Sequence, residues 1–355
     1  MIDWITCVAP LEHVAGEHGP FYAGEIMATK PDPTHPDGIS LDWSVLKRKS
    51  FEGSYSSTIQ IQSTRDELGR PAIWISGCPG KWFQGHNIFG SDDLRGIVLE
   101  MLHRICRSVG ITPSANDLAL WAAGIIELKR VDVTYSYWLE NRHRVRNAIR
   151  SLSSTANLKH RGGGHFRGDS LTFAEKSRRS SLTLYAKGPE LEVKGHELHP
   201  ALLATSLPAF ADGLLRAEVR MRAMALKREH LEYLAYWDDN AASELHQRFM
   251  AGLEVAEASM LDPKVLDGLP LRLHAVYQLW TDGHDLRSMY PKNTFYRHRR
   301  ALLAHGIDIA VKQERESADR SNVVPIRVVL NAVPVSAPDW AVGTPLYFEP
   351  RSKVA

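Results

Sequence analysis

Residues 130–136 read Arg-Val-Asp-Val-Thr-Tyr-Ser, and the strict alternation of this stretch decides the fold. Side chains two apart on a β-strand share a face. The polar residues therefore fall on one side of the predicted strand: Arg130, Asp132, Thr134 and Ser136. The apolar or aromatic ones fall on the other: Val131, Val133 and Tyr135. We expect one side to pack in a core and the other to present charge.

Two further stretches repeat this alternation. Residues 181–187 place four polar or aromatic side chains on one face: Ser181, Thr183, Tyr185 and Lys187. Residues 214–222 do the same with the most charged set: Arg216, Glu218, Arg220 and Arg222. A solvated sheet surface explains any one such strand. Three together favour a binding site, because charges that cluster on a β-face bind one another or an anionic ligand.

Around these strands the sequence predicts an α+β protein with an antiparallel sheet flanked by helices. Further strands are expected at 3–8, 57–63, 72–75 and 171–173, and helices at 91–110 and 141–151. From about 227 to 305 the pattern is nearly all helical, and residues 321–330 favour one last strand. We expect three parts: a catalytic domain over 1–230, a helical region over 231–310, and a C-terminal strand and tail over 311–355.

Composition narrows the class of protein. The chain has 355 residues, of which 44% are hydrophobic and 24% charged, as in globular proteins. Since 43 Lys and Arg face 41 Asp and Glu, any basic footprint must be local. Three scattered cysteines exclude a disulfide framework and a cysteine-based zinc module. Neither a basic leader nor a run of about 18 apolar residues is present, so we expect no signal peptide, no membrane span and a cytoplasmic location.

The polar face suits phosphoryl transfer to a tyrosine. A phenol with a pKa near about 10 attacks phosphorus slowly unless a cation or base stabilises its phenolate. Tyr185 is the candidate on this face, and Lys187, predicted to share it, could lower the phenol pKa or hold the scissile phosphate.

Carboxylates and a histidine would bind a divalent metal, Mg²⁺ or Mn²⁺, that polarises the phosphoryl oxygens. Asp132, Glu218 and His86 are the candidate ligands. Each has a plainer alternative: His86 could be a hydrogen-bonded structural residue, and Glu218 could be ion-paired between two arginines. The loop Lys81–Gly90 that carries His86 precedes a helix N-terminus, which suits an anion, but a strand-to-helix connection needs glycines and polar caps in any case.

A second DNA-binding element is predicted near the C-terminus. Residues 271–280 and 285–289 favour two helices, and a strongly basic helix follows, with Asn293 or Thr294 as its cap. This is the layout of a helix-turn-helix whose last helix enters the major groove, although a solvated basic helix explains it too. The predicted DNA contacts are Asn293, Thr294, Arg297, Arg299 and Arg300 on this helix, Arg161 and Arg167 in the loop 159–168, and Arg130, Arg216 and Arg220 on the strands.

These residues carry a resemblance to a known family, the replication initiation proteins of filamentous phages, of the gene II and X type. It extends almost end to end. The blocks are Met1-Ile2-Asp3, Gln84-Gly85-His86-Asn87-Ile88-Phe89-Gly90 with Asp93-Leu94, Arg130-Val131-Asp132-Val133-Thr134, Leu184-Tyr185-Ala186-Lys187, Phe210-Ala211-Asp212-Gly213-Leu214 with Arg216, Glu218 and Arg220, Thr294-Phe295-Tyr296-Arg297, Asn322-Val323-Val324-Pro325 and Pro338-Asp339-Trp340.

The resemblance implies a rolling-circle replication initiator. Such proteins nick the plus strand of double-stranded DNA at an origin hairpin, stay on the 5′ phosphate through a tyrosine, leave a 3′ hydroxyl primer and later rejoin the displaced single strand. It assigns the nucleophile to Tyr185 and implies a host helicase and DNA polymerase as partners in the bacterial cytoplasm. It also implies a five-stranded antiparallel sheet. The wider class carries a His-hydrophobic-His pair where Arg130-Val131-Asp132 stands here, so the metal ligands are divergent.

Two other functions stay open on the sequence. One is a non-catalytic regulator whose basic helix reads an origin or operator, as the shorter C-terminal products of the family do. The other is a metal-dependent nuclease that uses water, with Tyr185 incidental. Covalent trapping separates this nuclease from a tyrosine nickase, since hydrolysis leaves no protein on the DNA.

Overall fold

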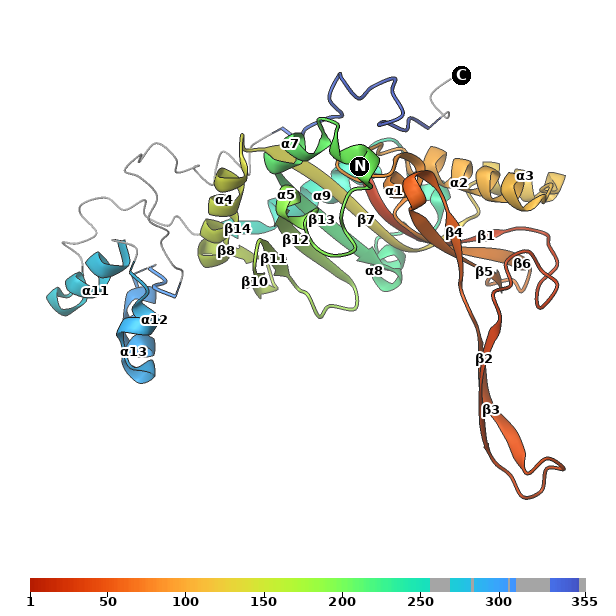
Figure 1. The fold of residues 1–355 in the computed structure, drawn as a ribbon, viewed down its shortest axis with the longest axis horizontal. Coiled ribbons are helices and arrows are strands. Elements are labelled where there is room, and N and C mark those ends of the chain that lie inside the picture. The colour runs from red at the N-terminus through yellow and green to blue at the C-terminus, as the bar shows by residue number, and fades with distance from the viewer. Residues whose placement is uncertain (256–268, 282–283, 306, 311–332, 351–355) are drawn as a thin grey trace.

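The computed structural model describes residues 1–255, 269–281, 284–305, 307–310 and 333–350. A nine-stranded sheet in the order β10-β11-β12-β13-β7-β1-β6-β5-β4 forms its centre (Figure 1). Neighbouring strands in it run antiparallel. Its strands are β1 (Ile2–Pro10), β4 (Lys49–Glu52), β5 (Thr58–Arg65), β6 (Pro71–Gly77), β7 (Glu127–Trp138), β10 (His165–Arg167), β11 (Ser170–Phe173), β12 (Ser180–Ala186) and β13 (Leu214–Arg222).

Smaller sheets complete the β-structure. β2 (Glu25–Pro31) and β3 (Ile39–Leu46) form a two-stranded ribbon that projects from the large sheet (Figure 1). β14 (Leu253–Val255), β8 (Ala156–Leu158) and β9 (Gly162–Gly163) form a three-stranded sheet.

Helices cover the apolar face of the large sheet. The helices up to residue 251 are η1 (Ser54–Ser56), α1 (Pro79–Gln84), α2 (Leu94–Val109), α3 (Ala115–Ala122), α4 (Arg142–Thr155), α5 (Lys187–Glu190), α6 (Pro200–Leu203), α7 (Leu207–Asp212), α8 (Ala223–Arg228), η2 (Leu234–Tyr236) and α9 (Ala241–Ala251). Side chains from α2, α4 and α9 share one core with Val131, Val133 and Leu182. His246 of α9 reinforces this packing, since its Nε2 hydrogen-bonds the Ala217 carbonyl at 3.0 Å. The opposite face is thereby left for polar side chains.

The alternating stretches form three adjacent strands, β12, β13 and β7, as the sequence predicts. The predicted helix at 91–110 is also present, but it begins at Leu94, because Asp93 rather than Ser91 caps it by accepting a hydrogen bond from the Gly96 amide at 2.7 Å. The expected five-stranded sheet is wrong: β4, β5, β6 and β10 extend it to nine strands. Strands β2 and β3 were not predicted, because proline and glycine residues are frequent in the stretch 9–49 that contains them. Strand β4, just after it, was also not predicted. The strand expected at 321–330 lies outside the described residues.

A separate apolar cluster holds the C-terminal helices together. α11 (Leu271–Thr281), α12 (Leu286–Met289) and α13 (Lys292–Leu303) contact one another pairwise. Their buried side chains share no member with the core of the large sheet: Leu269, Leu273, Val276, Tyr277, Trp280, Leu286, Phe295, Leu302, Ile307 and Ile309. Pro291 is the N-cap of α13, so the expectation that Asn293 or Thr294 caps it is wrong, and both residues lie in its first turn. None of the helices in the described ranges combines the length and apolarity that a bilayer crossing demands.

Phe295→Ala is expected to unfold this cluster locally. Phe295 is 2% exposed in the cluster, and removing a buried phenyl ring costs roughly 3–5 kcal/mol. Hydrogen exchange read by mass spectrometry should show faster exchange in peptides from 271–303 and unchanged protection in β7 and β13.

Tyr296→Ala is the matched control, because the neighbouring ring is 49% exposed and its loss should cost less than about 1 kcal/mol. Loss of protection in the large sheet of the Phe295 variant would contradict the separation of the two cores.

Candidate active site

The register of the three central strands arranges their polar side chains in rows on one face of the sheet. Residues opposite one another in an antiparallel pair share a face. The rows across β12, β13 and β7 are Tyr185, Arg216 and Ser136; Thr183, Glu218 and Thr134; and Ser181, Arg220 and Asp132. A cavity of about 1040 Å³ lies over this face. Its lining includes Asp132, Tyr185, Glu218 and Arg220.

Tyr185 is the half-buried aromatic side chain at one end of these rows. The guanidinium carbon of Arg216 lies 5.7 Å from the centroid of its ring, a cation–π contact. Burial raises the pKa of the phenol well above its usual value, and the positive charge of Arg216 opposes that rise. The phenol is therefore protonated at neutral pH, and Arg216 is the cation placed to favour its phenolate.

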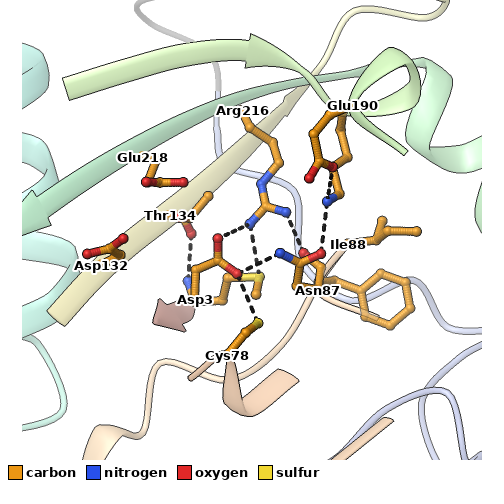
Figure 2. A network of polar contacts seen from close by, with 12 residues as sticks. Asp3, Cys78, Asn87, Ile88, Asp132, Thr134, Glu190, Arg216 and Glu218 are labelled. Atoms are coloured by element: carbon orange, nitrogen blue, oxygen red, sulfur yellow. Dashed lines mark hydrogen bonds and ion pairs between the residues drawn. The ribbon is translucent and has the colours of Figure 1, made fainter. Parts of the chain in front are cut away.

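A buried network of polar and charged groups surrounds Arg216 (Figure 2). The side-chain Nδ2 of Asn87 donates to Asp3 Oδ1 at 2.8 Å, and Lys187 Nζ donates to Asn87 Oδ1 at 2.8 Å and to Glu190 Oε2 at 2.5 Å. Arg216 donates to the Asn87 carbonyl, and its Nη2 lies 3.6 Å from Asp3 Oδ2. Residues from β1, α5, β13 and the loop 85–90 thus meet in one ion cluster.

Two sequence predictions are corrected by this network. Lys187 does not extend the polar face of β12, because the strand ends at Ala186 and Lys187 opens α5 with its side chain 0% exposed. Burial and the nearby Arg216 lower the pKa of its amine to about 8. Arg216 is also 0% exposed, so it makes no contact with DNA at the surface. Both cations point into the site and bind residues within it through hydrogen bonds and ion pairs.

The acidic residues of the site are ion-paired to arginines. Arg130 and Arg220 both donate to the Asp132 carboxylate, Arg220 Nε at 3.1 Å from Oδ2. Arg220 Nη2 also donates to Glu218 Oε1 at 2.9 Å. Burial and the negative charge of Asp132 raise the pKa of Glu218 to about 7. The predicted acids therefore do lie together, in the alternating-charge arrangement that the sequence left open.

His86 does not join these acids, which corrects its prediction as a metal ligand. Its Nδ1 accepts from the Ile88 amide at 3.2 Å, and its Nε2 lies 2.8 Å from the Leu346 carbonyl, so both ring nitrogens are used by backbone groups. Burial lowers the pKa of the imidazole to about 4, which keeps it neutral. No group of three or more His, Cys, Asp or Glu side chains in the described ranges is arranged to bind a metal ion.

The oxygen ligands that remain still suit Mg²⁺, because this ion is often held by one or two carboxylates together with substrate phosphates. Asp132 and Glu218 supply the carboxylates. Thr134 lies beside them in the rows, 0% exposed, and its hydroxyl has no hydrogen-bond partner within the part of the chain that the structure describes. A buried hydroxyl without a partner is costly, and an oxygen ligand beside two acids is a use for it.

The other predicted DNA contacts divide into two groups. Arg167 is exposed and lines the cavity, which Arg130 and Arg220 line as well. Arg161 lies elsewhere: it donates to the Ser180 carbonyl at 2.8 Å and to the Ser180 hydroxyl at 3.0 Å. Its guanidinium thus binds the first residue of β12.

Sequence reasoning missed that the C-terminal tail anchors the loop at 84–90. The ring of Phe348 stacks on Phe83 at 3.9 Å between centroids, and the Phe348 amide donates to Gln84 Oε1 at 2.7 Å. The Leu346 carbonyl, as noted, binds His86. Asp3, Asn87 and Glu190 were missed as well, although Asp3 and Asn87 stand in blocks that carry the family resemblance.

Comparison with known proteins places the chain among the replication proteins of bacteriophages. Residues 1–240 match the family of the N-terminal part of the gene II replication-associated protein, and residues 270–350 match the family of its C-terminal part. The chain belongs to this gene II family, as the sequence predicts.

Individual relatives align with this chain over most of their own length. The replication-associated protein of Enterobacteria phage I2-2 is 32% identical, over 95% of both chains. That of Enterobacteria phage M13 is 24% identical over 91% of this chain and 84% of its own. A solved rolling-circle replication initiator protein from Geobacillus stearothermophilus matches 74% of this chain and 88% of its own chain, at 12% identity and a TM-score of 0.30.

Gly85→Ala is expected to destabilise the loop beside the site. Gly85 has φ +82°, and a Cβ there would lie 2.3 Å from Cδ2 of the Tyr55 ring. Backbone strain of about 1 kcal/mol and overpacking of about 1–3 kcal/mol should both lower the free energy of unfolding, measured by urea titration.

Gly69→Ala measures the cost of backbone strain alone, since Gly69 has φ +76° and no atom lies within 4 Å of its Cβ position. Equal losses in the two variants would show that the ring of Tyr55 is not held against Gly85.

Proposed function

We propose that this protein initiates rolling-circle replication by nicking one DNA strand through a covalent bond to Tyr185. The observation that carries the proposal is a tyrosine in a large cavity, with a buried arginine against its ring and with Glu218 and Asp132 two and four positions along the same face. Membership of a replication-associated family supports the role. A regulator that only binds DNA has no use for this arrangement.

In the proposed reaction the Tyr185 oxygen attacks the scissile phosphorus. The new phosphorus–oxygen bond forms as the bond to the 3′ oxygen of the preceding nucleotide breaks, and the phenolic proton ends on that oxygen as a 3′ hydroxyl. The 5′ phosphate stays on the tyrosine. Because one phosphoester replaces another, attack by a 3′ hydroxyl reverses the step and joins strands.

Charged groups around the tyrosine divide this work. Arg216 stabilises the negative charge that develops on the phenol oxygen. Asp3 holds Arg216 directly, and Lys187 holds Asn87, whose carbonyl accepts a hydrogen bond from Arg216. Asp132 and Glu218 would hold the divalent cation, Mg²⁺ or Mn²⁺, with the Thr134 hydroxyl as a further oxygen ligand. When bound, such a cation polarises phosphoryl oxygens and offsets their charge.

The helices α11 to α13 are proposed to form the helix-turn-helix that binds the double-stranded origin. Asn293, Arg297 and Arg300 are exposed on α13 and available to bases or phosphates. Arg299 is not equivalent, since it forms a two-point ion pair with Asp308, with both contacts at 2.7 Å. The predicted boundary at 230 is too early, because Leu234, Leu245 and Leu253 are buried in the core of the large sheet. In the proposed role the nicking domain of 1–230 therefore includes this segment, the remainder of 231–310 binds the origin, and 311–355 is the tail. All three act with host helicase and polymerase in the host cytoplasm.

Tyr185→Phe is expected to abolish covalent attachment to DNA, because the attacking oxygen is gone. Purified protein is incubated with Mg²⁺ and supercoiled DNA that carries the cognate origin, and a denaturing gel is probed for protein on a 5′ end. Wild-type protein should give the adduct. Tyr236→Phe should give it too, since Tyr236 is exposed and does not line the cavity.

Each other result supports another function. Nicking without an adduct in the wild type would support hydrolysis by water, and an adduct that persists in Tyr185→Phe would move the nucleophile elsewhere. Binding without nicking in either protein would support the regulator.

Arg297→Ala and Arg300→Ala are expected to weaken binding of origin duplex and to make it less sensitive to salt. Each lost phosphate contact should reduce the slope of log affinity against log salt by about 1, measured by fluorescence anisotropy. Arg299→Ala should instead lower thermal stability, because it leaves Asp308 without its cation. An unchanged slope in the first two variants would count against α13 as the DNA contact.

A further inference from the structure

The cavity over the polar face is also lined by segments outside the three central strands, and the proposed chemistry leaves these unused. Tyr55 and Ser56 line it from η1, and His199 lines it from the segment just before α6. The rings of Tyr55 and His199 lie 5.6 Å apart between centroids, tilted at 57°. A second aromatic surface thus adjoins the same space as Tyr185.

The ring of Tyr55 is fixed in place by its surroundings. Tyr55 and Ser56 have φ of 51° and 54°, in the left-handed region that costs residues other than glycine roughly 1–2 kcal/mol each. Gly85 lies directly against the ring and can do so only because it lacks a Cβ. Leu202 Cδ1 also lies close, 3.0 Å from where a Cβ of residue 85 would stand. Such strain persists where the surrounding structure holds it, and it clusters at functional sites.

The chemistry of the cavity indicates what a fixed aromatic ring would bind there. Tyr55 is half-buried, so part of its ring stays open to the cavity. Lys81, Arg130 and Arg167 line the same space and suit phosphates. A nucleotide carries both a phosphate and a flat face, and the cavity volume of about 1040 Å³ lies at the upper end of the roughly 300–1,000 Å³ of common ligand pockets.

We propose that Tyr55, backed by His199, is a stacking platform for one unpaired base of the DNA strand that occupies the cavity. This inference rests on the proposed function, since the strand is the nicking substrate. Bases stack on aromatic side chains with little regard to sequence, and a base inside a duplex has no free face to offer. The platform therefore selects single-stranded DNA and sets its path past Tyr185.

The test measures stacking directly, on the full-length chain without Mg²⁺. The probe is a thymidine oligonucleotide with one 2-aminopurine, whose fluorescence falls when it stacks. Wild-type protein should quench the probe on binding. Tyr55→Leu should weaken the affinity about tenfold, the loss typical of one stacked base, and remove the quenching. Tyr55→Phe keeps the ring and should behave as wild type. Tyr236→Leu, an exposed tyrosine outside the cavity, is the matched control.

Two results would overturn the platform. The first is unchanged affinity and quenching in Tyr55→Leu. The second is weakened affinity and lost quenching in Tyr55→Phe, which would make its hydroxyl, rather than its ring, the group in use. If Tyr55→Leu melts early, His199→Ala leaves Tyr55 intact and should weaken binding about threefold; unchanged binding there would also count against the platform.

Failure of the proposed function is distinguishable, because it is read from the adduct formed by wild-type protein on origin DNA. Quenching without an adduct would keep the platform and remove the nickase. An adduct without quenching would keep the nickase and remove the platform.

Discussion

The rest of the site depends on the burial of the Arg216 guanidinium. A buried cation is stable only when counter-charges and hydrogen-bond acceptors surround it. Asp3 supplies the charge from β1 and the Asn87 carbonyl supplies an acceptor from the loop 85–90. Lys187 adds a second buried cation, which Glu190 and Asn87 satisfy. Four segments of the chain must therefore meet at this point (Figure 2). Their meeting fixes Arg216 against the ring of Tyr185.

The same constraint explains why the C-terminal tail lies on the first domain. Asn87 can hold Asp3 and Lys187 only if its loop is fixed, and that loop lies between α1 and α2, outside any strand or helix. The tail supplies what is missing: a carbonyl for His86, an amide for Gln84 and a ring for Phe83. Residues beyond position 333 thereby stabilise a loop some 260 residues earlier, as the separation of His86 and Leu346 shows.

Alternation in the sequence was enough to predict the three central strands and which side chains share their polar face, because strand periodicity is a local property. The ends of those strands were less predictable. Lys187 continues the alternation in sequence, yet it turns inward, since the chain enters α5 there and its ion-pair partner Glu190, which is half-buried, follows within one turn. His86 was misassigned for a related reason: its partner is a carbonyl in a tail whose position no local pattern encodes.

Positive and negative side chains balance one another inside the cavity, as they nearly do over the whole chain. Arg130 and Arg220 are paired with Asp132, and Arg220 also with Glu218, so neither these two arginines nor these two acids are free in this structure. A phosphate alone would displace the carboxylates from their arginines, and a metal ion alone would displace the arginines. Under the proposed function both arrive together: the DNA phosphate takes the arginines while the cation takes the acids, so no buried charge is left unpaired. Substrate and cation binding should then be coupled through these ion pairs.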